Sequence, residues 1–253
     1  MNPVRKPLCV VLTGAGISAD SGLQTFRGAG GLWEGHRVED VATPEAFAAH
    51  PQRVIDFYNV RRRQLRVVRP NAAHEALVAL EAGYEVRIVT QNVDDLHERA
   101  GSRHVLHLHG ELTQLRSTAR PDWRIAWHED QTPDQRDPWG APLRPHIVWF
   151  GEEVPLMPEA VAQVEAADVV LVVGTSLKVY PAAGLVHHAP AHAPVYLIDP
   201  HPAPGLSGVH VVAERAAVGV PRVVHQLLKQ VGADGDGDAD AGATPPPVPP
   251  LSR

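Results

Sequence analysis

The 253-residue chain contains a single cysteine, Cys9, and this scarcity excludes two kinds of covalent support. One cysteine cannot form an internal disulfide, and it cannot supply the thiolate pairs that hold a structural zinc ion. Aromatic residues make up only 5% of the chain, but the hydrophobic share as a whole is 44%. That share is enough for the core of one domain of ordinary size, with or without an insertion.

Long apolar runs and a strong charge imbalance are also missing. The longest apolar stretches, LCVVL at 8–12 and VVLVV at 169–173, have the length of strands and are too short to cross a bilayer. The formal net charge is −6, of which −3 comes from four Asp and one Arg after residue 231. This mild balance gives no electrostatic case for nucleic-acid binding, and the N-terminus carries no signal-peptide pattern. We therefore expect a cytoplasmic monomer that binds neither membranes nor nucleic acid.

Strand-like and helix-like patterns alternate along the chain. Short apolar segments predict buried strands at 8–12, 86–89, 105–108, 169–173, 195–198 and 209–212. Helical patterns lie between them, at 43–67 with a break at Pro51, and at 71–83, 159–167 and 221–231. The alternation predicts an α/β fold with a doubly wound, mostly parallel sheet. Residues 113–146 are predicted to form an irregular inserted lobe, and the low-complexity tail at 232–253 is predicted to be disordered.

Polar motifs follow five of the predicted strands: GAG at 14–16, TQNVD at 90–94, HG at 109–110, GTS at 174–176 and IDP at 198–200. Because ligands bind beyond the carboxyl ends of parallel strands, we expect all five motifs to meet at one crevice. The GAG glycines would let a pyrophosphate approach a helix N-terminus, although a tight turn without a ligand fits equally well. TQNVD can orient a carboxamide, or it can form an Asx turn before a helix from Asp95.

Two further pairs of residues have both a functional and a structural interpretation. His107 and His109 flank Leu108; one is expected to face a ligand as a general base and the other to pack in the core, and Gly110 favours a close ligand approach. Tyr58 and Arg61 are three residues apart on a predicted helix and so share a face. Together they can bind a carboxylate, but the run Arg61–Arg63 also fits a solvent-exposed basic helix face.

Taken together, five ordered motifs resemble those of the sirtuins, the NAD-dependent protein-lysine deacylases: GAGISADSGLQTFRG, TQNVDDLHERAG, HLHGEL, HIVWFGE and GTSLKVYPAAG. The resemblance covers about residues 8–230, and FYNVRRRQL is similar to the subclass of bacterial deacylases and the mitochondrial desuccinylase. It implies a catalytic domain over residues 1–231. Within it, a large Rossmann-like NAD-binding lobe (about 7–34, 68–112 and 150–231) would carry a small lobe (about 35–67 and 113–149).

The resemblance also implies roles for individual residues. His109 would be the proton acceptor, with Asn92 and Asp94 as further catalytic residues. NAD would contact a set drawn from all the strand ends: Gly14, Ala15, Gly16, Phe26, Arg27, Trp33, Gln91, Asn92, Asp94, Gly174, Thr175, Ser176, Asp199 and Ala217. An acylated peptide would pair as an added strand between 146–152 and 177–180, contacting Val148, Phe150, Gly151 and Val179. Tyr58 and Arg61 would bind the distal carboxylate of succinyl- or malonyl-lysine.

The implied reaction consumes NAD. The acyl oxygen attacks the nicotinamide ribose as nicotinamide leaves, and His109 then removes a proton from the ribose hydroxyls. The products are free lysine, nicotinamide and O-acyl-ADP-ribose, and deacetylation is expected to be weaker than removal of acidic acyl groups. Two alternatives remain at this stage: a mono-ADP-ribosyltransferase, and a non-catalytic sensor of NAD or acyl-lysine.

The chain departs from the sirtuin pattern mainly at the zinc site. In place of two cysteine pairs it has Ser117 and a run that ends in Asp137-Pro138-Trp139. The spacing of His128, Glu129, Asp130 and Asp134 fits no tetrahedral site, so we predict that zinc is absent. Three tryptophans (Trp123, Trp127 and Trp139) and several prolines are expected to stabilise this lobe instead. Smaller departures at Gln24-Thr25 and Asp199 are expected to leave NAD binding intact.

Overall fold

The computed structural model describes residues 5–24, 32–33, 35–202 and 207–235, with the side chains of 32–33 and 233–235 left aside. Phe26, Arg27 and residues 236–253 of the predicted tail lie outside the described residues. Within the described part of the chain, no helix has both the length and the apolar character that crossing a bilayer requires.

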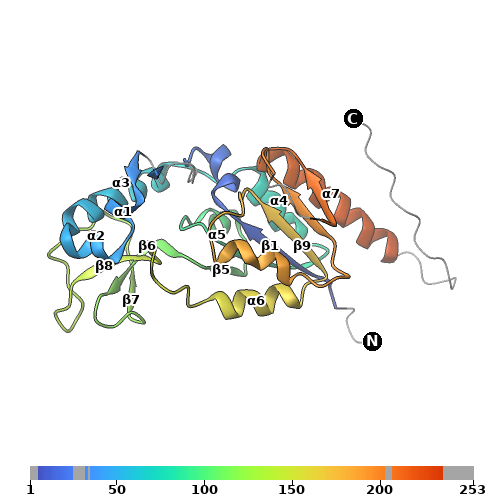
Figure 1. Cartoon of the computed structure of the whole chain (residues 1–253). Coiled ribbons are helices and arrows are strands. Elements are labelled where there is room, and N and C mark those ends of the chain that lie inside the picture. The colour runs from blue at the N-terminus through green and yellow to red at the C-terminus, as the bar shows by residue number, and fades with distance from the viewer. Residues whose placement is uncertain (1–4, 25–31, 34, 203–206, 236–253) are drawn as a thin grey trace.

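A six-stranded sheet forms the centre of the larger lobe (Figure 1). Its strand order is β11-β10-β9-β1-β4-β5, and all neighbouring strands are parallel. The strands are β1 (Leu8–Thr13), β4 (Glu85–Thr90), β5 (Val105–His107), β9 (Val169–Val173), β10 (Val195–Ile198) and β11 (Val209–Val212). Each lies within one residue of its predicted bounds, and the doubly wound parallel sheet is confirmed.

Helices cover both faces of this sheet: α4 (Ala72–Leu80) and α7 (Ala216–Gly235) on one, α6 (Met157–Glu165) and the 3-10 helix η3 (Ala182–His188) on the other (Figure 1). Successive residues of β1 alternate between the two layers. Cys9 and Val11 belong to the core with α4 and α7, whereas Val10 and Leu12 belong to the core with α6 and η3. Both faces of the central strand are therefore removed from water, which explains why its sequence is apolar throughout.

Shorter elements follow β1 and β4 along the chain. They are η1 (Ala15–Ile17), η2 (Ala19–Ser21), β2 (Leu32–Trp33), β3 (His36–Arg37) and α5 (Leu96–Ala100). The first two follow β1 directly, and α5 begins after Asp95, as predicted. The predicted GAG turn therefore opens onto two single-turn 3-10 helices rather than one long helix.

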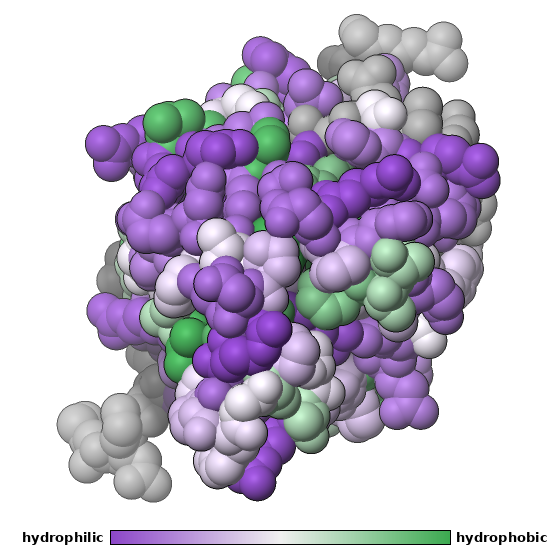
Figure 2. Space-filling model, turned by 90° about the vertical axis from the view of Figure 1, so that its left-hand side faces the viewer, coloured by the Kyte–Doolittle hydropathy of each residue, from purple (hydrophilic) through white to green (hydrophobic). Residues whose placement is uncertain are grey.

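The smaller lobe combines three helices with a second sheet. The helices are α1 (Val38–Val41), α2 (Pro44–Ala49) and α3 (Pro51–Val67), with the predicted break at Pro51. The sheet is antiparallel, in the order β7-β6-β8, with β6 at Gly110–Ser117, β7 at Arg124–Ala126 and β8 at Leu143–Ile147. Seen from this end, the surface is mostly hydrophilic, and its hydrophobic side chains gather in small patches (Figure 2).

The prediction of irregular structure over 113–146 is therefore wrong. The strands were hidden because β8 carries Arg144 and Pro145, which do not look like strand interior. In the described part of this small sheet β8 pairs only with β6, and an edge strand tolerates a proline that lacks an amide hydrogen.

The last helix also departs from its predicted bounds. Helix α7 begins at Ala216, five residues before Pro221, and continues to Gly235, so residues 232–235 are helical rather than disordered. The predicted helix began at Pro221, and proline is common at the first helical position. In the structure Pro221 lies inside the helix. Gly219 explains the close packing of this helix on the sheet, since a Cβ there would lie 2.6 Å from Cγ2 of Ile198.

Two histidines lie completely buried below the crevice, His74 on α4 and His97 on α5. Their ring centroids are 5.0 Å apart. Nδ1 of His74 accepts the Asn71 amide as part of a capping box, and Nε2 of His97 lies 3.1 Å from Oγ1 of Thr13. Burial lowers the pKa of His74 to about 4 and the pKa of His97 well below its usual value. Both rings are therefore neutral in the folded protein at neutral pH.

These lowered pKa values predict a loss of stability in mild acid. An unfolded histidine titrates near pH 6.5, so the unfolded chain binds more protons than the folded chain as the pH falls from about 6.5 toward 4. Each buried histidine should then cost up to about 1.4 kcal/mol of stability per pH unit. Urea unfolding at pH 7.0 and 5.5 measures this, with His74→Gln expected to lose less stability on acidification than the wild type because glutamine does not titrate. Glutamine can also complete the capping box.

The wild type has to be compared with His74→Gln because His107 acts in the opposite direction. The pKa of His107 is shifted upward, so its contribution to stability is present at low pH. The exposed His192→Gln variant serves as the control and should follow the wild type. An equal acid loss in wild type and His74→Gln would contradict the prediction.

Candidate active site

The two glycine-containing turns at the strand ends pack directly against each other. The amide of Gly14 donates to the carbonyl of Val173 at 3.0 Å, and the amide of Gly16 donates to the carbonyl of Gly174 at 2.8 Å. A Cβ on Gly16 would lie 2.6 Å from Cα of Gly174, which itself has φ +60°. The need for glycine here therefore comes from contact between the two turns, in addition to any ligand approach.

A cavity of about 820 Å³ opens where the carboxyl ends of β1, β4 and β9 face the smaller lobe. Seventeen of the predicted site residues line it: Gly14, Ala15, Gly16, Tyr58, Arg61, Gln91, Asn92, Asp94, His109, Val148, Phe150, Gly151, Gly174, Thr175, Ser176, Val179 and Asp199. All five polar motifs thus reach one crevice, as the strand pattern predicted.

The other four predicted residues are not among the described residues of this lining. Phe26 and Arg27 lie outside the described residues, as does most of the stretch from 25 to 34 that contains them. Trp33 belongs to β2, but its side chain is not described. Ala217 lies on α7 beside the cavity, and its amide is 3.4 Å from Oδ2 of Asp20. Its neighbour Arg215 lines the cavity instead and pairs with Asp20 at 2.9 Å.

A buried polar network joins the TQNVD motif to the first glycine turn. Nδ2 of Asn92 donates to the Gly14 carbonyl at 3.2 Å, and Oγ of Ser18 donates to Asp94 at 3.0 Å. Asp94 also accepts the amide of Leu96, so it forms the Asx turn before α5 as well as lining the cavity. Burial raises the pKa of Asp94 to about 6, although the hydrogen bonds from Leu96 and Ser18 oppose the shift. The functional and structural interpretations of this motif are therefore compatible.

The two histidines of HLHGEL have pKa values shifted in opposite directions. His107 places Nε2 at 2.8 Å from Glu98 and Nδ1 at 3.1 Å from the Asn92 carbonyl, so both ring nitrogens face acceptors. Burial alone would lower the pKa of His107, but the hydrogen bond and charge of Glu98 raise it. His107 is the packing histidine, which ties α5 to the Asn92 backbone.

His109 lines the cavity and is set up as a base. Its Nδ1 lies 3.0 Å from the Gln91 carbonyl; because a carbonyl only accepts, Nδ1 carries the proton and Nε2 is the basic nitrogen. Burial lowers the pKa of His109, so the ring is neutral at pH 7. Gly110, which follows it with φ +81°, is required by protein backbone rather than by a ligand, since a Cβ there would meet the His146 carbonyl oxygen.

Tyr58 and Arg61 both point inward from α3, with 0% and 8% of their surface exposed. Arg62 is buried as well, and of the three successive arginines only Arg63 is exposed, where it pairs with Asp130 at 2.9 Å. The interpretation of Arg61–Arg63 as a solvated face is therefore wrong for two of its three members. The phenol of Tyr58 accepts a hydrogen bond from Nε1 of Trp149 at 2.9 Å, and burial raises its pKa.

Comparisons with known proteins agree with this arrangement. The sequence pattern of the Sir2 family matches residues 14–181, which is more than half of the chain. The chain belongs to the Sir2 family. A relative from Aggregatibacter actinomycetemcomitans, described as an NAD-dependent protein deacylase, is 57% identical over 204 residues, which are 81% of this chain and 98% of that protein. A Helicobacter pylori strain J99 protein with the same description is 56% identical over 191 residues, covering 76% of this chain and 82% of its own.

Solved structures give the same answer for the fold. The crystal structure of a Sir2 homolog in complex with NAD superimposes with a TM-score of 0.81 at 38% identity, covering 89% of this chain and 91% of its own. The sirtuin resemblance and the Rossmann-like α/β fold that it implied are thus confirmed.

Three residues of this Sir2 site were missed by the sequence reasoning. Ser18 holds Asp94, Trp149 contacts Tyr58, and Glu152 accepts the Trp149 amide at 2.8 Å. All three were inside quoted motifs, but nothing in a single sequence says which motif side chains turn toward the ligand and which support it. A pairing of Trp149 with a helix 91 residues away is a consequence of tertiary structure alone.

The smaller lobe of this Sir2 chain does not offer a zinc site. Among the described residues no group of three or more His, Cys, Asp or Glu side chains could hold a metal ion, and Cys9 is buried in β1. At the positions of the expected cysteines, Oγ of Ser117 donates to Oδ2 of Asp137 at 2.6 Å and accepts the amides of residues 119 and 120. Oδ1 of Asp137 accepts two further amides, from residues 139 and 141. The donor atoms a metal would need are already used.

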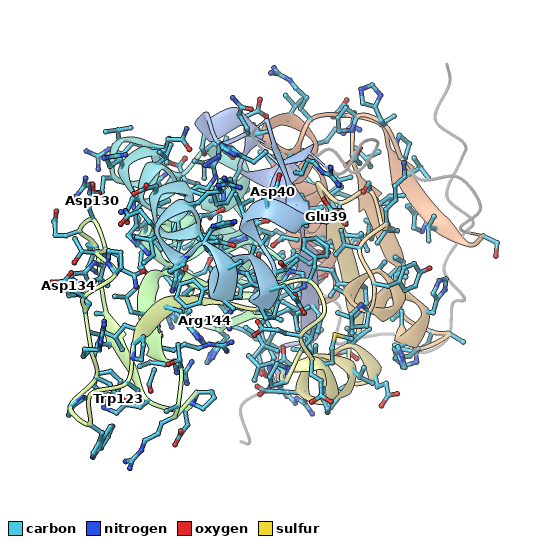
Figure 3. The ribbon with its side chains drawn as sticks, turned by 60° about the vertical axis from the view of Figure 1, so that its left-hand side comes forward. Glu39, Asp40, Trp123, Asp130, Asp134 and Arg144 are labelled. Carbon is cyan, nitrogen blue, oxygen red and sulfur yellow. The ribbon has the colours of Figure 1, made fainter. Side chains whose placement is uncertain are left out.

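Two of the other four candidate ligands pair with arginines of α3. Glu129 lies 2.7 Å from Arg66, and Asp130 pairs with Arg63. Figure 3 shows Asp130 and Asp134 at the outer edge of the lobe, with Trp123 at some distance below them. The prediction that buried tryptophans support the lobe is wrong for Trp139, which is 55% exposed and stacks on Arg120 at 3.8 Å. The buried Ser117–Asp137 pair is the central contact instead.

Because the Ser117–Asp137 pair stands where zinc ligands were expected, we predict that the protein is stable without metal. Metal analysis of the purified protein should find far less than one zinc per chain, and EDTA should leave the unfolding temperature unchanged. Ser117→Ala removes a buried hydroxyl with three hydrogen bonds and should cost about 1 kcal/mol or more, a fall of roughly 2–4 °C for each kcal/mol. The exposed Ser207→Ala variant is the matched control. One zinc per chain, or a lower unfolding temperature in EDTA, would contradict the prediction.

Proposed function

We propose that this protein is an NAD-dependent protein-lysine deacylase that prefers acyl groups ending in a carboxylate, such as succinyl and malonyl, over acetyl. The deacylase activity is supported by the relatives described above and by a cavity that joins both glycine turns to His109. The acyl preference is supported by one observation: Tyr58 and Arg61 are both buried and both line that same cavity. Its cytoplasmic location and its monomeric state stay predictions.

The cavity fits NAD at its large-lobe end. The backbone of Gly14–Gly16 and Gly174–Ser176 faces it, and Gly14 and Gly16 have no side chains that would fill it. NAD, when bound, would supply the leaving group, because nicotinamide departs as a neutral molecule. The chain's own part is orientation: Gln91 is fixed by Thr175 at 3.4 Å, and Asn92 by the Gly14 carbonyl. These amides would hold the carboxamide and the nicotinamide ribose.

Proton removal falls to His109. Its Nε2 is the basic nitrogen because Nδ1–H is held by the Gln91 carbonyl, and its lowered pKa keeps it unprotonated at pH 7. A base in this position would take the proton from a ribose hydroxyl as that oxygen attacks the acyl carbon. The products would be free lysine, nicotinamide and O-acyl-ADP-ribose.

The acyl end of the substrate would meet Arg61 and Tyr58. A guanidinium presents parallel N–H groups that match the two oxygens of a carboxylate, and the phenol is a further donor. Hydrogen bonds to a charged group are worth about 1.5–3 kcal/mol each. An acetyl group has no carboxylate to make them, so it would gain none of this energy.

The acyl preference can be tested with the double variant Tyr58→Phe, Arg61→Met. Loss of two charge-assisted hydrogen bonds should lower kcat/KM for a succinyl-lysine peptide by about two orders of magnitude or more, with a much smaller effect on an acetyl-lysine peptide. Steady-state assays of nicotinamide release with matched peptides measure both. Arg63→Met, on the same helix but exposed, should change neither value. Equal losses on the two peptides would refute the carboxylate receptor.

The reaction itself can be tested at His109. His109→Ala should lower deacylation by about 10²–10⁴-fold, the usual contribution of a general base, while NAD still binds. Because burial lowers the pKa of His109, the acidic limb of the wild-type kcat/KM profile should lie below pH 6.5.

The exposed His104→Ala variant should keep full activity and the same pH profile. Mass spectrometry of the peptide separates deacylation from ADP-ribosylation, since only the latter adds mass. Near-normal turnover by His109→Ala, or an acylated peptide left intact by wild-type protein with NAD, would overturn the assignment.

A further inference from the structure

Trp149 lines the same cavity as Tyr58 and Arg61 and has no assigned role. It follows β8, is 2% exposed, and donates its indole N–H to Oη of Tyr58 at 2.9 Å. An indole nitrogen can only donate, so the phenol oxygen must be the acceptor in this bond. The hydroxyl proton of Tyr58 consequently points away from Trp149.

Trp149 itself is fixed from two sides by one ion pair. The guanidinium of Arg144 lies 3.3 Å from the centre of a Trp149 ring and binds both oxygens of Glu152, at 2.6 and 3.0 Å. Glu152 in turn accepts the backbone amide of Trp149 at 2.8 Å. Arg144 holds the ring of Trp149 and Glu152 holds its backbone, so the indole N–H has little freedom. Figure 3 shows Arg144 on the inner side of the smaller lobe.

The surroundings of Tyr58 favour a negative partner for its hydroxyl. Arg61 and Arg144 both act on the phenol as nearby positive charges, and Glu152 is the opposing negative charge. Glu152 is already bound by Arg144 and Arg116, at 2.6 and 3.2 Å. A carboxylate from a ligand would therefore find two cations near the hydroxyl and a carboxylate that is already paired.

We propose that Trp149 is a positioning residue for acyl selectivity, which sets the rotation of the Tyr58 hydroxyl so that its proton points to a carboxylate bound by Arg61. The Arg144–Glu152 pair fixes Trp149 and so acts through it. This inference rests on the proposed acyl preference. It adds a third member to the receptor, which acts by orienting Tyr58.

A purely structural role for Trp149 gives a different expectation. The ring also packs against Phe47, with centroids 5.3 Å apart, so its removal would disturb the lobe. If packing were its only role, substitution would lower stability and affect both peptides alike. The selectivity ratio, kcat/KM for succinyl-lysine divided by that for acetyl-lysine, separates the two roles because it cancels a general loss.

Trp149→Phe keeps an aromatic ring and removes the N–H. We expect the selectivity ratio to fall about three- to tenfold, the value of one hydrogen bond, mainly through a higher KM for the succinyl peptide. In a Tyr58→Phe background the same substitution should leave the ratio unchanged, since no hydroxyl remains to be oriented. Trp139→Phe, at the exposed end of the lobe, should leave the ratio unchanged in wild-type protein.

Incorporation of 3-benzothienylalanine at position 149 repeats the test with the indole shape preserved and sulfur in place of N–H. It should give the same fall in the ratio with a smaller change in unfolding temperature, and it serves if Trp149→Phe folds poorly.

The outcomes are distinguishable. If wild-type protein shows no preference for succinyl-lysine, the proposed acyl preference fails and this inference fails with it. If wild type has the preference, Tyr58→Phe removes it, and both Trp149 replacements keep the wild-type ratio, the inference alone is overturned. An equal fall in the ratio in the wild-type and Tyr58→Phe backgrounds would also overturn it, because Trp149 would then act without Tyr58.

Discussion

The contact between the turn after β1 and the turn after β9 is the constraint on which the site depends. The two backbones approach so closely that a Cβ at Gly16 would lie 2.6 Å from Gly174, and the Gly16 amide bonds directly to the Gly174 carbonyl. β1 lies between β4 and β9 in the sheet, so this contact fixes one wall of the cavity, and Asn92, bound to the Gly14 carbonyl, fixes the next. The crevice at the strand ends is thus a property of the backbone before any catalytic side chain is considered.

The different roles of His107 and His109 follow from the groups that their ring nitrogens contact. Both histidines are largely buried, and burial alone would lower both pKa values. Glu98 reverses the shift for His107, whereas His109 has only the Gln91 carbonyl, which orients the ring without supplying a charge. One carboxylate on α5 therefore gives these two histidines, two residues apart, pKa shifts in opposite directions. The choice between them could not be made from the sequence, since Glu98 is nine residues from His107 and becomes its neighbour only in the fold.

The sequence could predict the features that local patterns determine, but not those that depend on tertiary contacts. β1 and β9 are apolar on both faces, so they were found within one residue; the strand ends and the convergence of polar motifs followed from them. β6, β7 and β8 were missed because a small antiparallel sheet with an edge proline lacks that signal. The helical spacing of Tyr58 and Arg61 placed them on one face, but only the fold shows that this face is inward. Arg62, 1% exposed with its guanidinium on the Asn59 amide oxygen and the Leu112 carbonyl, follows no local rule at all.

The two ends of the smaller sheet explain how the lobe would hold together without zinc and still serve the site. β6 runs from Gly110, beside His109, to Ser117, a length of about 23 Å at roughly 3.3 Å per residue. At the far end Ser117 pairs with Leu143 of β8, and at the near end Gly110 pairs with Ile147, across an irregularity between Glu111 and Leu115. The Ser117–Asp137 bond therefore secures the end of β8 that lies away from the chemistry. Both ends of β8 are thus anchored to β6, and Trp149 follows its near end and contacts Tyr58. The hydrogen-bonded pair at the distant end needs no thiolates.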